Sequence, residues 1–318
     1  MDDKRYNNEG KLEASEIADM LETPTSTPIF RRKFSWLRVA VLLIIAGAAM
    51  MAIGAALGGR GGGLFITNDG IQFVTNESVT SYANLTNTAN ISEITVLATN
   101  SSITVRPGRE LRVRFENIEA EYTQNGTNLI IDSRRYETGA GVSTTFNFSF
   151  LGYYAPSRII IEVPRNQLND LNITTTSGQI RMDEITTGSL IAHTTNGGIR
   201  GEEIRFTTGD LRTTNGGITL EEPVWETLTA QTTNGTIRIT EANIRGPETN
   251  LQTTNGGITI STTRPRRHFA YDVRSSSGSI RVGSSRYNAG RWSSPRTEGD
   301  SLIIASTVNG SIRISFDD

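Results

Sequence analysis

The sequence predicts an all-β protein: a right-handed β-solenoid with coils of about 19–22 residues, preceded by one N-terminal transmembrane helix. Two observations carry this prediction. One short phrase returns at a nearly constant interval through the C-terminal half of the chain, and one long uncharged apolar run lies near its N-terminus. A repeat period near twenty residues indicates stacked coils. An apolar run of about twenty residues is long enough to cross a bilayer.

The repeated phrase is Thr-Thr-Asn-Gly-Gly-Ile. Its clearest copies begin at Thr194, Thr213, Thr232 and Thr253, and the third copy has Thr236 in place of the second glycine. Looser copies occupy residues 175–180 and 275–280. The closing isoleucines are 19, 19, 19, 21 and 22 residues apart and are Ile180, Ile199, Ile218, Ile237, Ile258 and Ile280.

Each copy predicts a strand, a turn and a second strand. Apolar residues alternate on both sides of the phrase, as in Leu190 and Ala192 before one turn and Ile218 and Leu220 after the next, so they share one buried face. Asn-Gly is a strong turn signal because both residues tolerate positive φ. The predicted turns are Asn196-Gly197, Asn215-Gly216, Asn234-Gly235 and Asn255-Gly256. The same frame fits residues 94–105 and 303–314.

A β-sandwich of serial hairpins is the alternative, but it gives identical residues no reason to recur at matching offsets. In a solenoid such residues stack about 4.8 Å apart, so we expect Asn196, Asn215, Asn234 and Asn255 to form a hydrogen-bonded ladder. Right-handed coiling follows by analogy with crossover connections. A third wall is expected from Ile185, Ile204, Val224 and Ile244, with further corners at Gly188, Gly209 and Gly246.

The apolar run extends from Val39 to Gly59, 21 residues without a charge. Arg31, Arg32 and Lys33 lie shortly before it, so the positive-inside rule places the N-terminus in the cytoplasm and the repeats outside. A cleaved signal peptide is the alternative, but the charged lead of 38 residues is too long for one. Small residues four apart in the run, Gly54 and Gly58, could pair two such helices in a homo-oligomer.

These features divide the chain into four parts. Residues 1–36 are expected to be a largely disordered acidic tail, with a short docking helix as the alternative, and residues 37–59 the transmembrane helix. Residues 60–90, rich in Gly, Asn, Thr and Ser, are expected to be a linker or stalk. Residues 91–318 form the repeat domain.

Composition excludes several classes of function. The absence of cysteine removes disulfides and thiolate metal sites. A net charge of −2 without a basic block argues against nucleic acid as a partner. His193 and His268 are the two histidines, and no nucleophile elbow, zinc-binding helix or phosphate loop accompanies them. We therefore expect no catalytic, cofactor or metal residues, and no enzyme.

Acidic residues recur at one place in four coils: Asp183-Glu184, Glu202-Glu203, Glu221-Glu222 and Glu241. Oxygen ligands of this kind suit Ca²⁺, and carboxylates on a β-helix can also cleave polysaccharides. Arginines such as Arg181 and Arg200 lie two or three residues away, however. A salt-bridged, solvated edge is therefore the favoured interpretation.

A binding surface is the better functional hypothesis. The second threonine of each phrase points outward, so Thr195, Thr214, Thr233 and Thr254 should form a column of hydroxyls. A regular polar array suits a periodic partner such as a cell-wall or surface glycan, although threonine also favours strands for structural reasons alone. A surface protein is the other partner considered.

The segment Arg158 to Pro164, followed by Leu168, Leu171 and residues 175–180 and then by the Thr-x-Asn/Ser-Gly-x-Ile coils, resembles the prokaryotic putative-adhesin β-strand-repeat family of unknown function, related to head-domain adhesins. The resemblance covers about residues 91–318. It implies a β-solenoid at the cell surface, tethered by a membrane helix, for adhesion or envelope structure. An envelope sensor that signals through the tail is one alternative, and a polysaccharide-active enzyme is another.

Overall fold

The structure, a computed structural model, describes residues 43–47, 63–67, 70–74, 80–137, 156–165 and 167–317. The chain divides into two units, Met1–Gly58 and Gly59–Asp318. In the first unit residues 43–47 are helical, and their side chains are mostly exposed. Among the described residues, no helix has the length and apolar character needed to cross a membrane. Most of the expected span from Val39 to Gly59 lies outside the described residues, so the span stays a prediction.

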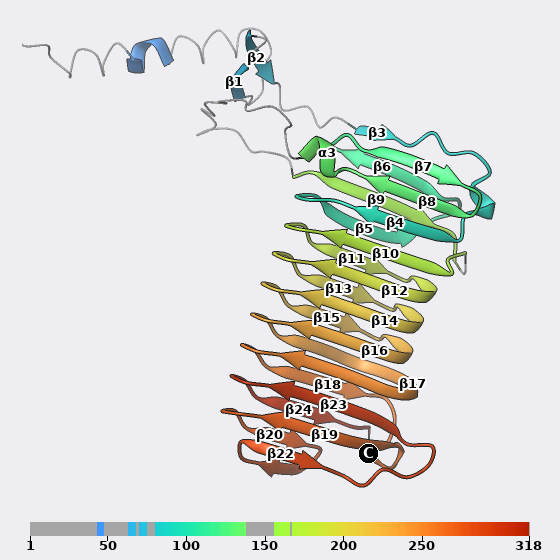
Figure 1. The fold of residues 1–318 in the computed structure, drawn as a ribbon, viewed down its shortest axis with the longest axis vertical. Coiled ribbons are helices and arrows are strands. Elements are labelled where there is room, and N and C mark those ends of the chain that lie inside the picture. Colours follow the sequence, from blue (N-terminus) through green and yellow to red (C-terminus); the bar gives the residue numbers. More distant parts are fainter. Residues whose placement is uncertain are drawn as a thin grey trace, which may run out of the picture. The chain divides into compact units, whose positions relative to one another are not determined.

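The second unit contains a β-solenoid with two faces of parallel strands (Figure 1). The short-strand face consists, in spatial order, of β9 (Arg158–Val163), β5 (Ser102–Pro107), β11 (Ile180–Asp183), β13 (Ile199–Glu202), β15 (Ile218–Glu221), β17 (Ile237–Thr253), β18 (Ile258–Thr262), β24 (Ile312–Ser315) and β20 (Ile280–Val282). The long-strand face consists of β8 (Asn128–Asp132), β4 (Glu93–Leu97), β10 (Asp170–Thr175), β12 (Thr186–Thr194), β14 (Arg205–Thr213), β16 (Val224–Thr232), β17 again, β23 (Ser301–Thr307) and β19 (Phe269–Ser275).

The core lies between these two faces and consists of the residues that alternate inward along each strand. Ile180, Ile199 and Ile218 pair in register on neighbouring strands and are almost completely buried. Leu190 and Ala192 supply the facing layer from β12. The predicted solenoid, its inward positions and the two outlying copies at 94–105 and 303–314 are therefore confirmed. The handedness of coiling stays a prediction.

The spatial order of the coils departs from the chain order at both ends. The coil of β4 and β5 lies between β8/β9 and β10/β11, although β8 and β9 follow it in the chain. At the other end β23 and β24 insert between β17/β18 and β19/β20. The last strands of the chain are therefore internal to the stack, and the coil before them in sequence is terminal.

Antiparallel strands cap both ends of the stack. At one end β3 (Thr80–Tyr82) pairs with β6 (Arg112–Glu116), β6 pairs with β9, and β7 (Glu121–Asn125) pairs with β8. At the other end β21 (Ser285–Tyr287) covers β20, and β22 (Gly290–Ser293) covers β19. An exposed parallel edge would recruit further strands, so these caps protect the protein from end-to-end aggregation.

The remaining elements are short. β1 (Gly63–Thr67) and β2 (Gly70–Val74) form an antiparallel hairpin within the predicted linker, to which β3 also belongs in sequence. The others are η1 (Thr88–Asn90), α3 (Arg134–Glu137) and η2 (Arg266–His268). The cap strands β21 and β22 both lie within residues 285–293.

The expected third wall is not separate. The strands that follow Ile185 and Ile204 pair directly as part of the long-strand face, and Val224 begins β16 of that face. Gly188, Gly209 and Gly246 lie within strands and not at corners. In four coils the second corner instead falls at a glutamate with positive φ, at Glu184, Glu203, Glu222 and Glu241. These left-handed glutamates were not predicted, because few side chains other than Asn, Asp and Gly favour this conformation.

An ion pair fastens the terminal cap to the coil beneath it. Arg291 of β22 donates from Nε to Asp272 Oδ1 of β19 at 2.9 Å. This hydrogen bond, with the charge of Arg291, holds the pKa of Asp272 below its ordinary value. The pair's stabilisation is therefore present above the unfolded pKa, near pH 4, and is lost as the pH falls through the lower folded pKa.

We expect amide exchange in β22, corrected for its intrinsic rate, to accelerate below about pH 4. In Asp272→Asn the exchange should already be fast at neutral pH and should lose this pH dependence. An unchanged profile in the variant would show that the pair does not hold the cap.

Candidate ligand-binding groove

The first threonine of each phrase points inward and secures the corner between coils. Thr213 Oγ1 donates to Gly197 O of the preceding coil at 2.7 Å, and Thr232 Oγ1 donates to Gly216 O at 2.8 Å. Thr194, Thr253 and Thr307 make the same bond at 2.8–3.0 Å. These hydroxyls are buried, so each bond satisfies a carbonyl that water does not reach easily.

The asparagines form the predicted ladder. Each Nδ2 donates at 2.8 Å to Oδ1 of the asparagine in the neighbouring coil, from Asn215 to Asn196, from Asn234 to Asn215 and from Asn255 to Asn234. Asn309 extends the ladder to Asn255 with the same distance. The insertion of the C-terminal coil next to β17/β18 therefore preserves the corner register.

The expected reason for the glycine at this corner is wrong. Neither Asn196 nor Gly197 has positive φ. The glycine is required because the backbones approach closely: a Cβ on Gly197 would lie 1.9 Å from Gly178 O, and one on Gly216 would lie 1.9 Å from Gly197 O. At the second glycine a Cβ on Gly198 would lie 3.4 Å from Gly217 O, which is an ordinary contact. This difference explains why Thr236 and Ser311 are accepted at the second position but not the first.

The two adjacent threonines of a phrase give a matched pair for testing this geometry. Thr213→Val removes the hydroxyl that satisfies the Gly197 carbonyl, and we expect it to cost about 1–3 kcal/mol of stability. Thr214→Val changes an exposed side chain and should alter stability by less than about 0.5 kcal/mol. Denaturant unfolding of both variants measures the difference. Equal losses would show that the inward bond does not stabilise the coil.

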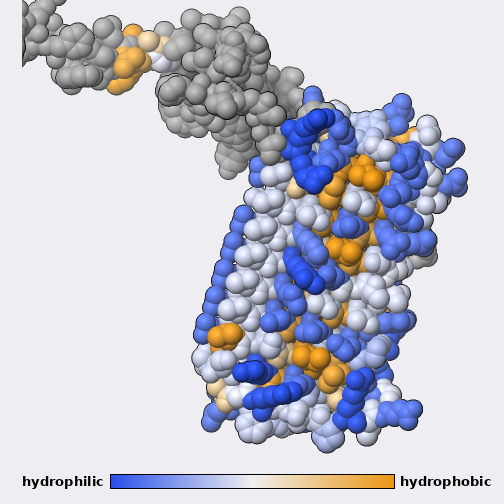
Figure 2. Space-filling model, viewed as in Figure 1, coloured by the Kyte–Doolittle hydropathy of each residue, from blue (hydrophilic) through white to orange (hydrophobic). Residues whose placement is uncertain are grey.

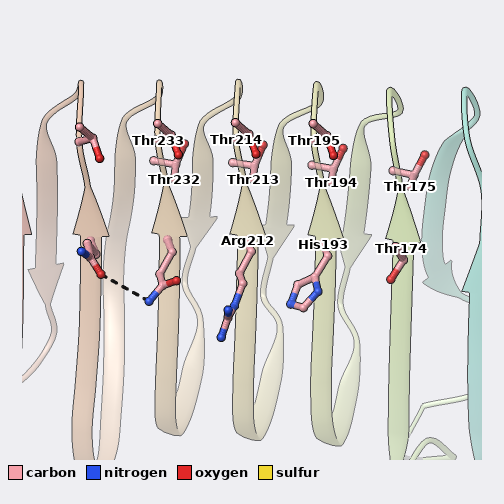
Figure 3. Close-up of a pocket in the computed structure, with 13 residues that line it drawn as sticks. Thr174, Thr175, His193, Thr194, Thr195, Arg212, Thr213, Thr214, Thr232 and Thr233 are labelled. Carbon is pink, nitrogen blue, oxygen red and sulfur yellow. Dashed lines mark hydrogen bonds between the residues drawn. The ribbon is translucent and has the colours of Figure 1, made fainter.

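The second threonines lie outward, as predicted, and line a shallow groove on the long-strand face. Thr195, Thr214, Thr233 and Thr254 are all exposed. The groove has a volume of about 400 Å³ and runs across the ends of β10, β12, β14, β16 and β17. Figure 3 shows the outward threonines in a row beside the turns, with His193 and Arg212 further along the same strands. We call this surface the threonine groove. The ligand-binding role of these threonines stays a prediction.

A second row of polar side chains forms the other margin of the threonine groove. It consists of Thr174, His193, Arg212, Gln231 and Gln252, which pair in register across neighbouring strands. Gln231 Nε2 donates to Gln252 Oε1 at 3.5 Å (Figure 3). Amide and hydroxyl groups thus recur on successive rungs, each able to donate and accept.

Asp210 contacts two members of this row, Arg212 and His193. Its Oδ1 accepts from Arg212 Nε at 2.7 Å, and its Oδ2 lies 3.3 Å from His193 Nε2. The hydrogen bond and attraction to Asp210 raise the pKa of Arg212 further, so the guanidinium stays charged. Sequence reasoning missed Asp210, although its position two residues before Arg212 on an outward face could have indicated it. The groove is consequently close to neutral.

Apolar surface on the described part of the solenoid is discontinuous. On the side of the molecule seen in Figure 2, hydrophobic residues gather in separate places among polar ones. Within the described part of the solenoid, the exposed large hydrophobic residues are Tyr82, Tyr122, Trp292 and Val308. Trp225 is buried and donates from Nε1 to Thr249 Oγ1 at 2.9 Å, so it cannot contact a ligand. Tyr287 and Trp292 stack on each other in the terminal cap, with ring centroids 4.5 Å apart.

The acidic edge lies along the short-strand face, and four of its carboxylates, those of Asp183, Glu184, Glu202 and Glu221, form ion pairs. Arg181 pairs with Asp183 at 2.8 Å and lies 3.6 Å from Glu202, and Arg200 pairs with Glu221 at 2.9 Å. Glu184 pairs with Arg165. No three carboxylate or histidine side chains in the described ranges come together in an arrangement suited to a metal ion. These ion pairs agree with the expected solvated edge.

The fold and groove define a class of protein: a capped β-solenoid with a periodic polar surface. Residues 165–315 match the model of the family described as Toastrack DUF4097. The resemblance to a β-strand-repeat family of unknown function is thereby confirmed. None of the curated proteins compared with the chain is a significant match.

Several solved structures are similar to this chain. A "putative adhesin" from Bacteroides fragilis has 13% sequence identity and a TM-score of 0.47, with 76% of this chain and 98% of that chain covered. A "putative adhesin" from Parabacteroides merdae has 8% identity and a TM-score of 0.40, with 75% and 96% covered. A "putative lipid binding protein" from Parabacteroides distasonis has 12% identity and a TM-score of 0.35, with 76% and 95% covered.

Proposed function

We propose that this protein is a membrane-anchored cell-surface protein that binds a glycan through the threonine groove, in an adhesive or envelope-structural role without catalysis. The observation that carries the proposal is the threonine groove itself. Its hydroxyl and amide groups repeat from coil to coil, with a strand spacing of about 4.8 Å. A flat periodic surface of this kind suits a periodic polar polymer better than it suits a compact small molecule.

Charge and polarity support an uncharged glycan as the ligand of this groove. The Asp210 carboxylate balances Arg212, and the remaining lining groups are neutral hydroxyls and amides apart from His193. Because each hydroxyl can both donate and accept, neighbouring rungs can bind successive sugar hydroxyls. Single contacts of this type are weak in water, so useful affinity requires several rungs to act together.

An array of neutral glycans and cell-wall polymers, probed with the full chain in detergent, tests this proposal. The double variant Thr214→Val with Thr233→Val removes two outward hydroxyls from the groove. Thr219→Val with Thr259→Val is the matched control, because these threonines lie outward on the short-strand face of the same stack. We expect the groove variant to lose binding by about tenfold or more and the control to keep it. Retention by both variants, or loss by both, would contradict the groove as the binding site.

The anchor and its orientation rest on the apolar run from Val39 to Gly59 and the basic residues before it. Protease treatment of intact cells should remove the repeat domain and leave the N-terminal tail protected. Protection of the repeats with cleavage of the tail would reverse the proposed topology.

A further inference from the structure

The outward residues of the short-strand face form a single row along the solenoid. On neighbouring strands this row pairs Arg181 with Arg200, then Thr219, Arg238, Thr259, Arg313 and Arg281 in turn, and ends with Arg286 of the cap. Arginine therefore occupies most of the rungs. The two halves of the row differ in what surrounds these guanidinium groups.

In the first half, carboxylates balance the arginines. Asp183 and Glu202 lie two residues after Arg181 and Arg200, on the same side of each strand, and Glu221 occupies the next rung. The ion pairs of Arg181 and Arg200 with these acids have distances of 2.8–3.6 Å. This half is consequently a neutralised surface.

In the second half the corresponding positions carry no acid. Two residues after Arg238, Arg281 and Arg313 the chain has Thr240, Gly283 and Ser315. Arg313, Arg281 and Arg286 are exposed and lie directly opposite one another on consecutive strands. Within the described part of the chain none of these three makes an ion pair, and Asp317, four residues after Arg313, makes none either.

This arrangement has an energetic cost. Like charges directly opposite each other on neighbouring strands destabilise a sheet. The rungs are about 4.8 Å apart, closer than the screening length of about 8 Å at physiological salt. The repulsion between Arg313, Arg281 and Arg286 is therefore only partly screened, and an anion seated over them would relieve it.

Hydroxyl donors accompany the unbalanced arginines. Ser311 and Ser279 precede Arg313 and Arg281 by two residues, and their Oγ atoms lie 3.2 Å apart. The same position holds Gln179 before Arg181, and it holds a glycine before Arg200 and Thr219. Guanidinium and hydroxyl groups together form a surface of donors, which matches carboxylate, sulfate or phosphate oxygens.

We propose that Arg313, Arg281 and Arg286, with Ser279 and Ser311, form a binding surface for an anionic polysaccharide at the C-terminal end of the solenoid. We call it the arginine surface. It lies on the opposite face from the threonine groove and does not rest on the function proposed for that groove. Its few charges and the net charge of −2 suit a short anionic stretch of polymer better than nucleic acid, whose binding is dominated by contacts of basic side chains with many phosphates.

The test uses the full chain in detergent and immobilised dextran sulfate and polygalacturonate, with uncharged dextran as the reference surface. The variant Arg281→Gln with Arg313→Gln removes two charges from the arginine surface. The matched control Arg205→Gln with Arg245→Gln removes two exposed arginines that make no ion pair in the described residues and lie in other parts of the coils. We expect binding to the anionic polymers to fall about tenfold or more in the first variant and less than about twofold in the control.

Equal weakening in the two variants, or no binding of anionic polymer by the wild-type protein, would overturn the proposal. Tighter binding of single-stranded DNA with the same dependence on Arg281 and Arg313 would assign the surface to nucleic acid instead. Binding of neutral glycans through the threonine groove should be unaffected by these substitutions. The proposals for the two sites can therefore be contradicted independently of each other. The thermal midpoint serves as the folding control: the first variant should melt no lower than wild type at low salt, because like-charge repulsion has been removed.

Discussion

Gly197→Ala is expected to lower the stability of the solenoid by about 3 kcal/mol, since an added methyl group has no room. Its Cβ would lie 1.9 Å from Gly178 O and 2.9 Å from Thr194 Oγ1. Both obstacles belong to the corner itself: the first is backbone of the neighbouring coil, and the second is the hydroxyl that donates to that same carbonyl. Moving the two coils apart would relieve the clash, but it would also break the hydrogen bonds of the asparagine ladder. The strain therefore cannot be relieved without a further loss of stability.

Gly198→Ala is the matched control for this prediction. The adjacent glycine has ordinary φ, and its added Cβ would meet Gly217 O at 3.4 Å. Replacing such a glycine reduces the entropy of the unfolded chain, so the variant should be neutral or more stable by up to about 1 kcal/mol. Denaturant unfolding combined with amide exchange at the corner distinguishes the two variants. Similar effects of both would mean that the close approach of the corners is not what selects glycine.

Deletion of residues 301–318 is expected to destabilise the C-terminal end of the solenoid strongly. The lost strands β23 and β24 lie between β17/β18 and β19/β20, so their removal separates the terminal cap from the stack. It also exposes the edges of β17 and β18, and exposed parallel edges promote aggregation. We expect the truncated protein to aggregate, and residues 265–300 to become sensitive to protease.

A shorter truncation controls for the loss of the C-terminus itself. Removing Asp317 and Asp318 leaves Phe316, which packs against Phe269 with ring centroids 5.5 Å apart, and should leave protease resistance unchanged. Continued resistance of residues 265–300 in the longer truncation would mean that β19 and β20 can pair directly with β17 and β18. That result would contradict the claim that β23 and β24 are needed to attach the terminal coil to the stack.

The repeat sequence predicts the regular coils well, because each side chain in them has one recurrent environment. The apolar positions, the outward threonines and the ladder through Asn234 and Asn255 all follow from the alternation of side chains and from a fixed interval. Asn309 extends the ladder although its coil is distant in sequence, because the residues around it match the repeated phrase. Local pattern was sufficient wherever neighbouring coils are equivalent.

The order of the terminal coils and the second corner could not be predicted in this way. Identical phrases pair equally well in several orders, so nothing in the phrase itself places β23 next to β17. The corner at Glu203 and Glu222 uses a backbone conformation for which glutamate has no preference, and tertiary packing imposes it. The contact of Asp210 with His193 likewise depends on which coils are neighbours, whereas its pairing with Arg212 lies within one strand.

The most direct test of the account is footprinting of the threonine groove with its ligand present. Hydroxyl radicals oxidise histidine and tryptophan side chains that solvent reaches, and His193 lies in the groove while Trp292 lies in the terminal cap. With the full chain saturated by a neutral glycan that it binds, oxidation of His193 should fall strongly and oxidation of Trp292 should stay the same. Unchanged oxidation of His193 at saturating glycan would contradict the central claim that the long-strand face is the binding surface.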